Sequence, residues 1–199
     1  MNLNDSTGGR VGYSDRITDP AFAKYIKNNN RWAVIFSLIL AAAAIIGFFI
    51  AGEMGADGME NPQALLIGTG IGGMFLLITL FIVIGRKRCK TWDGVVVDKK
   101  VKKKEKTQGS GDDSYSVKYL EYVVTVQSQE GKKYRMTAED DSTVYDYFLI
   151  GDRVRHHEGL NSYEKYDKSK DSIIFCSACA TLCDINDDFC WRCKCPLLK

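Results

Sequence analysis

Residues 32–52 read WAVIFSLILAAAAIIGFFIAG, 21 residues without a charged side chain, and they decide the fold. A second uncharged run of 22 residues, ALLIGTGIGGMFLLITLFIVIG, covers 64–85. At a rise of about 1.5 Å per residue, each run forms a helix roughly 30 Å long, enough to cross the hydrocarbon core of a bilayer. Buried helices of a soluble protein need a far larger protein around them, and a cleaved signal peptide has a shorter lead and apolar core. We therefore predict a transmembrane helical hairpin at 32–85.

The average composition does not show how strongly apolar and polar residues are separated along the chain. The 199 residues are 45% hydrophobic and 26% charged, with a net charge of +2. Two apolar runs carry much of that hydrophobicity, which excludes one globular core over the whole chain. An aromatic content of 11% excludes wholesale disorder, because it leaves enough apolar material to bury elsewhere.

Basic residues precede the first apolar run and follow the second, but none lies in the connection between the two runs. The flanking residues are Lys24, Lys27 and Arg31 before the first run, and Arg86, Lys87, Arg88 and Lys90 after the second. The connection 53–63 contains three acidic residues and no Lys or Arg. The positive-inside rule therefore places both termini, including the segment 1–31, in the cytoplasm. We expect a multi-pass protein of the cell (plasma or inner) membrane.

The predicted spans lack the ionisable residues that pumps and channels use. Neither contains Asp, Glu, Lys, Arg or His, so we expect an anchor in the lipid bilayer and not a transport path. Small residues recur every four positions, as Ala43, Gly47 and Ala51 in the first span and as Gly68 and Gly72 in the second. Such spacing lets helix backbones approach closely. Packing within the hairpin is the preferred interpretation, and a homo-oligomer is the alternative.

Residues 91–172 show short β-type segments separated by turns. We expect strands at 92–98, 119–126, 132–137, 154–156 and near Ile173, with a short helix at 144–148 that Asp141–Thr143 cap. A small closed or nearly closed antiparallel β-barrel is the economical solution, because closure leaves few exposed edges. The predicted fold class is thus an α+β membrane protein with a helical hairpin, a cytoplasmic barrel at 91–172 and a zinc ribbon at 173–199.

Two short motifs carry a resemblance for this middle region. Residues 149–154 (LIGDRV) resemble a turn common in small barrels of the OB or SH3-like kind. The triplet Trp92-Asp93-Gly94, soon after the second apolar run, is similar to the start of the cytoplasmic barrel in uncharacterised bacterial membrane proteins. The resemblance implies an OB- or SH3-like fold and says nothing about a ligand.

A lysine-rich run, KKVKKKEK at 99–106, lies between the first two expected strands and precedes a polar connection at 108–113. The run could contact anionic lipid headgroups, where each basic side chain contributes about 1 kcal/mol. It could instead neutralise nucleic-acid phosphates, or form a solvated extension without a partner. No Phe or Tyr is interleaved with the lysines to stack bases, which disfavours nucleic acid.

The strongest chemical signal is a pair of Cys-x-x-Cys knuckles near the C-terminus. The four cysteines are Cys176, Cys179, Cys190 and Cys193, with ten residues between the pairs. Two such knuckles brought together form the tetrahedral sulfur cage that zinc accepts. Disulfides are the alternative, but the predicted cytoplasmic location keeps thiols reduced. We expect a closed, structural zinc site, for which iron of the rubredoxin type is a second option.

The tail resembles the short zinc-ribbon family of the form Cys-x-x-Cys … Phe-Cys-x-x-Cys-Gly-x-Pro-Leu. The match covers residues 176–197, and it implies that the four cysteines are the ligands. Two positions depart from the pattern, because Lys194 and Ala180 stand where the permissive backbone of glycine is common. Cys183 and Cys195 are surplus thiols, which could displace a ligand or help hold a second metal but are most simply bystanders.

No known catalytic signature is present. The sequence lacks a Walker loop, a Gly-x-Ser-x-Gly elbow and a His-Glu-x-x-His motif. His156 and His157 are adjacent, so on a strand they face opposite sides, and we expect both at an exposed edge. The leading hypothesis is a non-enzymatic module that docks a protein partner at the cytoplasmic face of the membrane. The alternatives are a membrane-associated nucleic-acid-binding protein that uses 99–106 and the ribbon, and a membrane-enzyme subunit whose active groups come from a partner.

Overall fold

The computed structural model describes residues 11–55, 58, 60–109 and 111–199. The chain divides into two compact units. Residues 19–90 form the helical unit, and residues 91–199 together with 11–18 form a mixed unit that is mainly β-sheet. The N-terminal residues therefore belong to the same unit as the C-terminal half, although the helical unit separates them in sequence.

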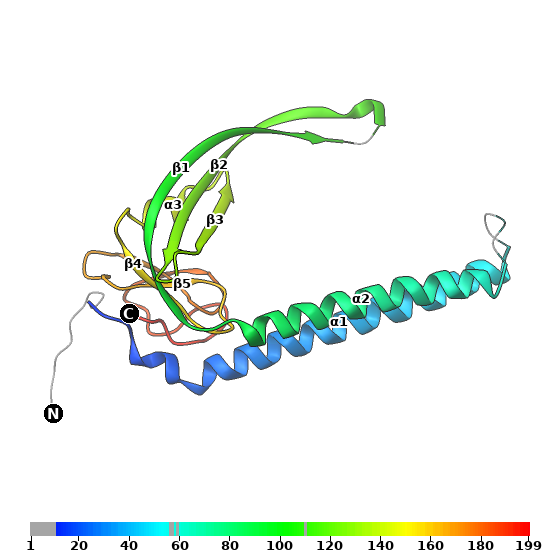
Figure 1. Cartoon of the computed structure of the whole chain (residues 1–199), viewed down its shortest axis with the longest axis horizontal. Coiled ribbons are helices and arrows are strands. Elements are labelled where there is room, and N and C mark those ends of the chain that lie inside the picture. Colours follow the sequence, from blue (N-terminus) through cyan, green and yellow to red (C-terminus); the bar gives the residue numbers. More distant parts are fainter. Residues whose placement is uncertain (1–10, 56–57, 59, 110) are drawn as a thin grey trace. The chain divides into compact units, whose positions relative to one another are not determined.

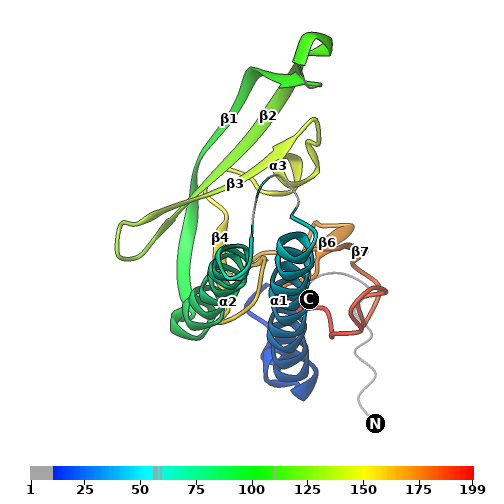
Figure 2. The same ribbon diagram turned by 90° about the vertical axis from the view of Figure 1, so that its right-hand side faces the viewer.

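Two long helices make up the helical unit. Helix α1 spans Pro20–Glu53 and helix α2 spans Gln63–Arg88, and they lie side by side (Figures 1 and 2). The Asp19 carboxylate accepts a hydrogen bond from the Ala21 N–H at 2.8 Å, and Pro20 occupies the first helical position, which together fix the start of α1. Both helices are long and apolar enough to cross a membrane. Their large side chains point outward, as Leu66 and Phe81 illustrate with exposures of 71% and 70%.

Small residues let α1 and α2 approach closely. A Cβ atom on Gly68 would lie 2.8 Å from the Phe48 Cβ and 3.0 Å from the Ala44 carbonyl oxygen. At Gly72 it would lie 3.2 Å from the carbonyl oxygen of Ala41. The backbone of α2 thus takes the space that side chains would need, as expected for its two glycines.

The small-residue face predicted for α1 is wrong. Ala43 and Gly47 are exposed, and a Cβ on Gly47 would meet nothing within 4 Å. Helix α1 instead turns Ala41, Ala44 and Phe48 toward α2. The four-residue spacing of small residues does not reveal which face of α1 meets its neighbour, because small residues also recur on the face that does, where Ser37, Ala41 and Gly52 are buried.

We predict that Gly68→Leu separates the helices and that Gly70→Leu does not. Both substitutions raise helix propensity by about 1 kcal/mol, but only Gly68 lacks room, since a Cβ on Gly70 meets nothing within 4 Å. Overpacking at Gly68 should cost about 1–3 kcal/mol. The measurement is SDS titration of the full chain, followed by energy transfer between dyes attached through unnatural amino acids at residues 24 and 88. Equal midpoints for the two variants would contradict the packing described above.

Five antiparallel strands form the main sheet of the mixed unit. The strands are β1 (Trp92–Gln108), β2 (Tyr115–Ser128), β3 (Lys133–Glu139), β4 (Arg153–His156) and β5 (Tyr163–Lys165). Their order is β3-β2-β1-β4-β5, so β3 and β5 are the two edges. The sheet is open, and the predicted closed barrel is wrong. Closure would require the edge strands to pair, but β5 has only three residues.

Strands β1 and β2 pair with each other over most of their length (Figure 1). Their register extends to Gln108 opposite Tyr115, whereas β4 pairs only with 92–95 of β1. The predicted strands at 92–98 and 119–126 are therefore too short. Lysine is a poor strand former in general, but the carboxylates and tyrosines on the facing strands support the extension, as shown below.

The core lies where the sheet meets helix α3 (Thr143–Tyr147) and the C-terminal segment. Val96, Val126 and Val154 from the sheet pack with Phe148 and Phe175. Phe175 ends strand β6 (Ile173–Phe175), which pairs with β7 (Leu182–Asp184) in a separate two-stranded sheet (Figure 2). The residue directly before the first cysteine of the cluster is therefore part of the core of the mixed unit.

Candidate metal centre

The two Cys-x-x-Cys segments fold into turns with the same backbone hydrogen bonds. In the first, the Cys176 N–H donates to the Thr181 carbonyl at 2.9 Å, and the Ala180 N–H donates back to the Cys176 carbonyl at 2.8 Å. In the second, Cys190 donates to Cys195 at 2.8 Å and accepts from Lys194 at 3.0 Å. This repeated geometry gives the cluster an internal pseudo-symmetry, in which each turn projects its two sulfur atoms toward the other.

Both turns place a residue other than glycine in the left-handed backbone region. Ala180 has φ 57° and Lys194 has φ 61°. A side chain in this region costs about 1–2 kcal/mol. These are the two positions at which the sequence departs from the zinc-ribbon pattern, so the structure explains why glycine suits them.

The four sulfur atoms form a compact cluster. All lie within 4.8 Å of one another, with Cys176 Sγ 3.5 Å from Cys193 Sγ and Cys179 Sγ 3.6 Å from Cys190 Sγ. A tetrahedral ion with metal–sulfur bonds of about 2.3 Å requires sulfur–sulfur edges of about 3.8 Å. Disulfide bonds measure about 2.05 Å, and the described cysteines form none. The donor set thus fits a metal ion.

Protons compete with a metal ion for these sulfur atoms. Burial raises the pKa of Cys176 to about 12 and also raises the pKa of Cys193. Burial opposes ionisation of Cys190 too, but the backbone N–H groups of Cys193 and Arg192 lower its pKa to about 7. A metal ion must therefore displace protons from Cys176 and Cys193, so the affinity for metal should fall as the solution is acidified.

The remaining cysteines lie outside the four-sulfur set. Cys183 is a buried residue of β7, and burial together with contact to Cys190 raises its pKa to about 11. Cys195 is 1% exposed and serves the second turn through its backbone carbonyl. Cys89 ends α2 in the other unit. The Cys183 side chain contacts that of the ligand Cys190.

Exposed apolar side chains surround the second turn, a feature that sequence reasoning missed. Phe189 and Trp191 flank the ligand Cys190 and are 59% and 63% exposed. The indole N–H of Trp191 donates to the Leu182 carbonyl at 3.2 Å, which places this ring beside β7. We call Leu182, Phe189 and Trp191 the ribbon patch. The sequence signal was the pair of aromatic residues on either side of a metal-ligand cysteine.

The two histidines are not at an exposed edge as predicted. His157 is 5% exposed, and its Nε2 lies 2.7 Å from the Glu164 carboxylate. His156 is half-buried and stacks on Trp92 with ring centroids 5.7 Å apart. Glu164 also accepts a hydrogen bond from the buried Lys168 ammonium at 2.9 Å. His157, Glu164 and Lys168 are enclosed and joined by hydrogen bonds, which indicates a structural role.

The lysine run 99–106 lies within β1 and is not a link between strands. Two of its lysines meet carboxylates on other strands. Lys104 pairs with Glu121 of β2 at 2.6 Å, and Lys106 pairs with Glu139 of β3. Tyr119 of β2 lies opposite Lys104 in the pairing of β1 with β2. Aromatic rings therefore do accompany the lysines, although none is interleaved with them in the sequence. These carboxylates neutralise part of the charge that phosphates would need.

Comparison of the chain with family models, with curated proteins and with solved structures finds no match. The similarity of the tail to zinc ribbons therefore rests on the cysteine spacing and on the sulfur geometry described above. Two apolar helices of membrane-spanning length and a cysteine cluster suited to a metal ion are the features that bear on function.

Proposed function

We propose that this protein is a membrane-anchored interaction module. Helices α1 and α2 are the anchor, and the cysteine ribbon is a zinc-stabilised platform that docks a protein partner at the cytoplasmic face. The observation that carries the proposal is the exposed ribbon patch of Leu182, Phe189 and Trp191 on a closed four-sulfur site. Exposed apolar patches on a rigid support are typical of protein-binding surfaces.

Zinc is the ion that suits this donor set best. Four thiolates in a compact cluster give zinc its preferred tetrahedral coordination and leave it no open position. An ion without an open position cannot take a substrate, so we propose that the site is structural and that the ribbon is not an enzyme. Iron shares the ligand preference, and elemental analysis of the purified protein distinguishes the two.

The anchor proposal is supported by the surface of the helical unit. Large apolar side chains cover both helices, and basic residues gather only where the chain enters α1 and leaves α2. This distribution is unfavourable in water and matches a bilayer with the basic end in the cytoplasm. The mixed unit, which carries the ribbon, would then lie on the cytoplasmic side of the cell membrane.

Photo-crosslinking in cells tests the docking surface. We expect a photoreactive amino acid at position 191, in place of Trp191, to give one discrete cross-linked product. The matched control is the same amino acid in place of Tyr115, an aromatic residue 60% exposed at the far end of β2. Absence of a product at 191, or an equal set of products at both positions, would contradict the proposal that the ribbon patch docks a partner.

A further inference from the structure

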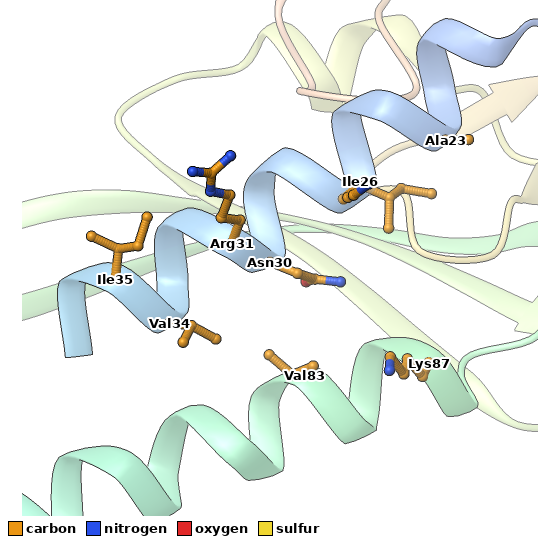
Figure 3. A pocket seen from close by; sticks show the side chains of 9 residues that line it. Ala23, Ile26, Asn30, Arg31, Val34, Ile35, Val83 and Lys87 are labelled. Carbon is orange, nitrogen blue, oxygen red and sulfur yellow. The ribbon is translucent and has the colours of Figure 1, made fainter. Parts of the chain in front are cut away.

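An open groove of about 630 Å³ separates α1 from α2 at the end where the chain enters α1 and leaves α2 (Figure 3). The close packing at Gly68 and Gly72 does not continue to this end. Val34 and Val83 face one another here across the gap between the helices (Figure 3). With Ile26, they give the groove apolar walls that merge with the apolar surface of the two helices.

A hydrogen bond between the helices holds the groove in shape. The Asn30 side-chain oxygen accepts from the Arg86 guanidinium at 3.1 Å. Asn30 lines the groove on α1, whereas Arg86 belongs to the last turn of α2. The separation of the two helices at this end is therefore set by protein atoms, and a ligand need not force them apart.

Three cationic residues line the groove. The cations are Lys27 and Arg31 of α1 and Lys87 of α2. Along the sequence, the acidic residues nearest to them are Asp19 and Glu53 on the α1 side and Asp93 after α2. Among the ion pairs formed by the described residues, none involves these three side chains.

We propose that the groove binds one anionic phospholipid. One acyl chain lies against Ile26, Val34 and Val83, and the phosphate lies against the ammonium groups of Lys27 and Lys87. The guanidinium of Arg31 points away from α2 (Figure 3) and adds positive charge beside the groove. Basic pockets between helices at the cytoplasmic surface suit anionic headgroups in this way, and the volume is within the range of ligand sites, about 300–1,000 Å³. A soluble phosphate would pair with the cations but would leave the apolar walls of the groove exposed to water. This inference rests on the proposed membrane anchor.

Native mass spectrometry of the full chain in detergent tests the site. The probes are dioleoyl phosphatidylglycerol and dioleoyl phosphatidylcholine, added at equal concentration. We expect one phosphatidylglycerol per chain, retained about tenfold more strongly than phosphatidylcholine. The triple variant Lys27→Gln, Arg31→Gln, Lys87→Gln should lose this preference. The matched control Lys24→Gln, Arg88→Gln, Lys90→Gln removes the same number of exposed charges from outside the groove and should keep it.

Two further measurements separate the parts of the proposal. Val83→Trp fills the groove without changing its charge and should lower retention of phosphatidylglycerol about tenfold. Soluble glycerol phosphate should not displace the lipid. Equal loss of preference in both triple variants would overturn the site, because it would show only a general attraction of basic residues for anionic lipid. The site is likewise overturned if glycerol phosphate displaces the lipid at equal concentration, since the acyl chain would then contribute nothing.

Carbonate extraction of native membranes separates failure of this site from failure of the anchor. A chain that resists extraction but shows no headgroup preference contradicts the lipid site and leaves the anchor supported. A chain that carbonate releases contradicts the anchor, and the lipid site with it. Resistance to extraction combined with a preference lost only in the groove variant supports both proposals.

Discussion

The Cys176→Ser substitution is expected to abolish stoichiometric metal binding and to unfold the ribbon. Removing one of four thiolates opens the tetrahedral cage, and metal binding is the main source of folding free energy in small zinc modules, about 10–16 kcal/mol. The segment 173–199 has few other sources of folding free energy. Its two strands have three residues each, and its largest buried side chains are those of Ile174, Phe175, Ile185, Leu197 and Leu198.

The experiment uses the full chain in mild detergent, with metal content measured by elemental mass spectrometry. Folding of the ribbon is followed by hydrogen exchange over 173–199. Wild-type protein should carry one zinc ion per chain, and Cys176→Ser should carry far less and exchange rapidly. Helices α1 and α2 should keep their protection in both, because they belong to a separate compact unit. A strong chelator should convert the wild type to the behaviour of the variant.

Two control variants distinguish ligands from bystanders. Cys183→Ala removes a buried thiol of β7 that lies outside the four-sulfur set, and it should keep one metal ion at a modest cost in stability. Cys89→Ser, in the other unit, should change nothing. Full metal content in Cys176→Ser, or its loss in Cys183→Ala, would contradict the assignment of ligands, and the second result would make Cys183 a ligand.

The features that sequence predicted well are local ones. Each knuckle depends on residues within five positions of one another, so the spacing of Cys176 and Cys179 already defines a turn. The apolar helices are equally local, because length and lack of charge suffice to define them. Their mutual packing is not local. Gly68 contacts Phe48 and Ala44 on the face of α1 that also buries Ser37, Ala41 and Gly52. Small residues recur on more than one face of the run 32–52, so their spacing alone does not choose between the faces.

The strand pairing of the main sheet also depends on residues that are far apart in the sequence. Strand β1 continues through the lysine run because Glu121 and Glu139 on other strands accept those lysines, and pairing partners depend on register, which the linear sequence does not state. Barrel closure likewise depends on whether β3 and β5 meet. The buried position of His157 depends on Glu164 and on an N-terminal segment about 150 residues away.

Glu164→Ala is expected to destabilise the mixed unit by about 3–5 kcal/mol, because it leaves a buried ammonium without its carboxylate. Glu164 is 3% exposed, and it accepts hydrogen bonds from Lys168 Nζ at 2.9 Å and from the Ser14 N–H at 2.6 Å. Lys168 is fully buried, and its other hydrogen bond in the described structure goes to the Gly12 carbonyl at 2.9 Å. The substitution should therefore also release residues 11–14 from the sheet.

Urea unfolding of the full chain in detergent, followed by tryptophan fluorescence, measures the loss, and hydrogen exchange at 11–14 reports the release. The matched control is Glu105→Ala, which removes an exposed carboxylate 3.5 Å from Lys118 and should cost no more than about 1 kcal/mol. An equal cost for both variants would contradict the role of burial.

The double variant Glu164→Leu, Lys168→Met separates electrostatics from packing. It removes both charges and keeps most of the side-chain volume, and replacing a buried pair in this way is often neutral or stabilising. We expect it to recover part of the stability lost in Glu164→Ala, because the buried His157 ring loses its carboxylate partner in both variants. Residues 11–14 should stay loosened, because the hydrogen bonds to Ser14 and Gly12 are gone. Recovery of stability without recovery of docking would show that this buried pair orients the N-terminal segment and adds little net stability. If docking also returned, the hydrogen bonds would not be what holds residues 11–14, and their backbone pairing with Tyr166 and Asp167 would be sufficient.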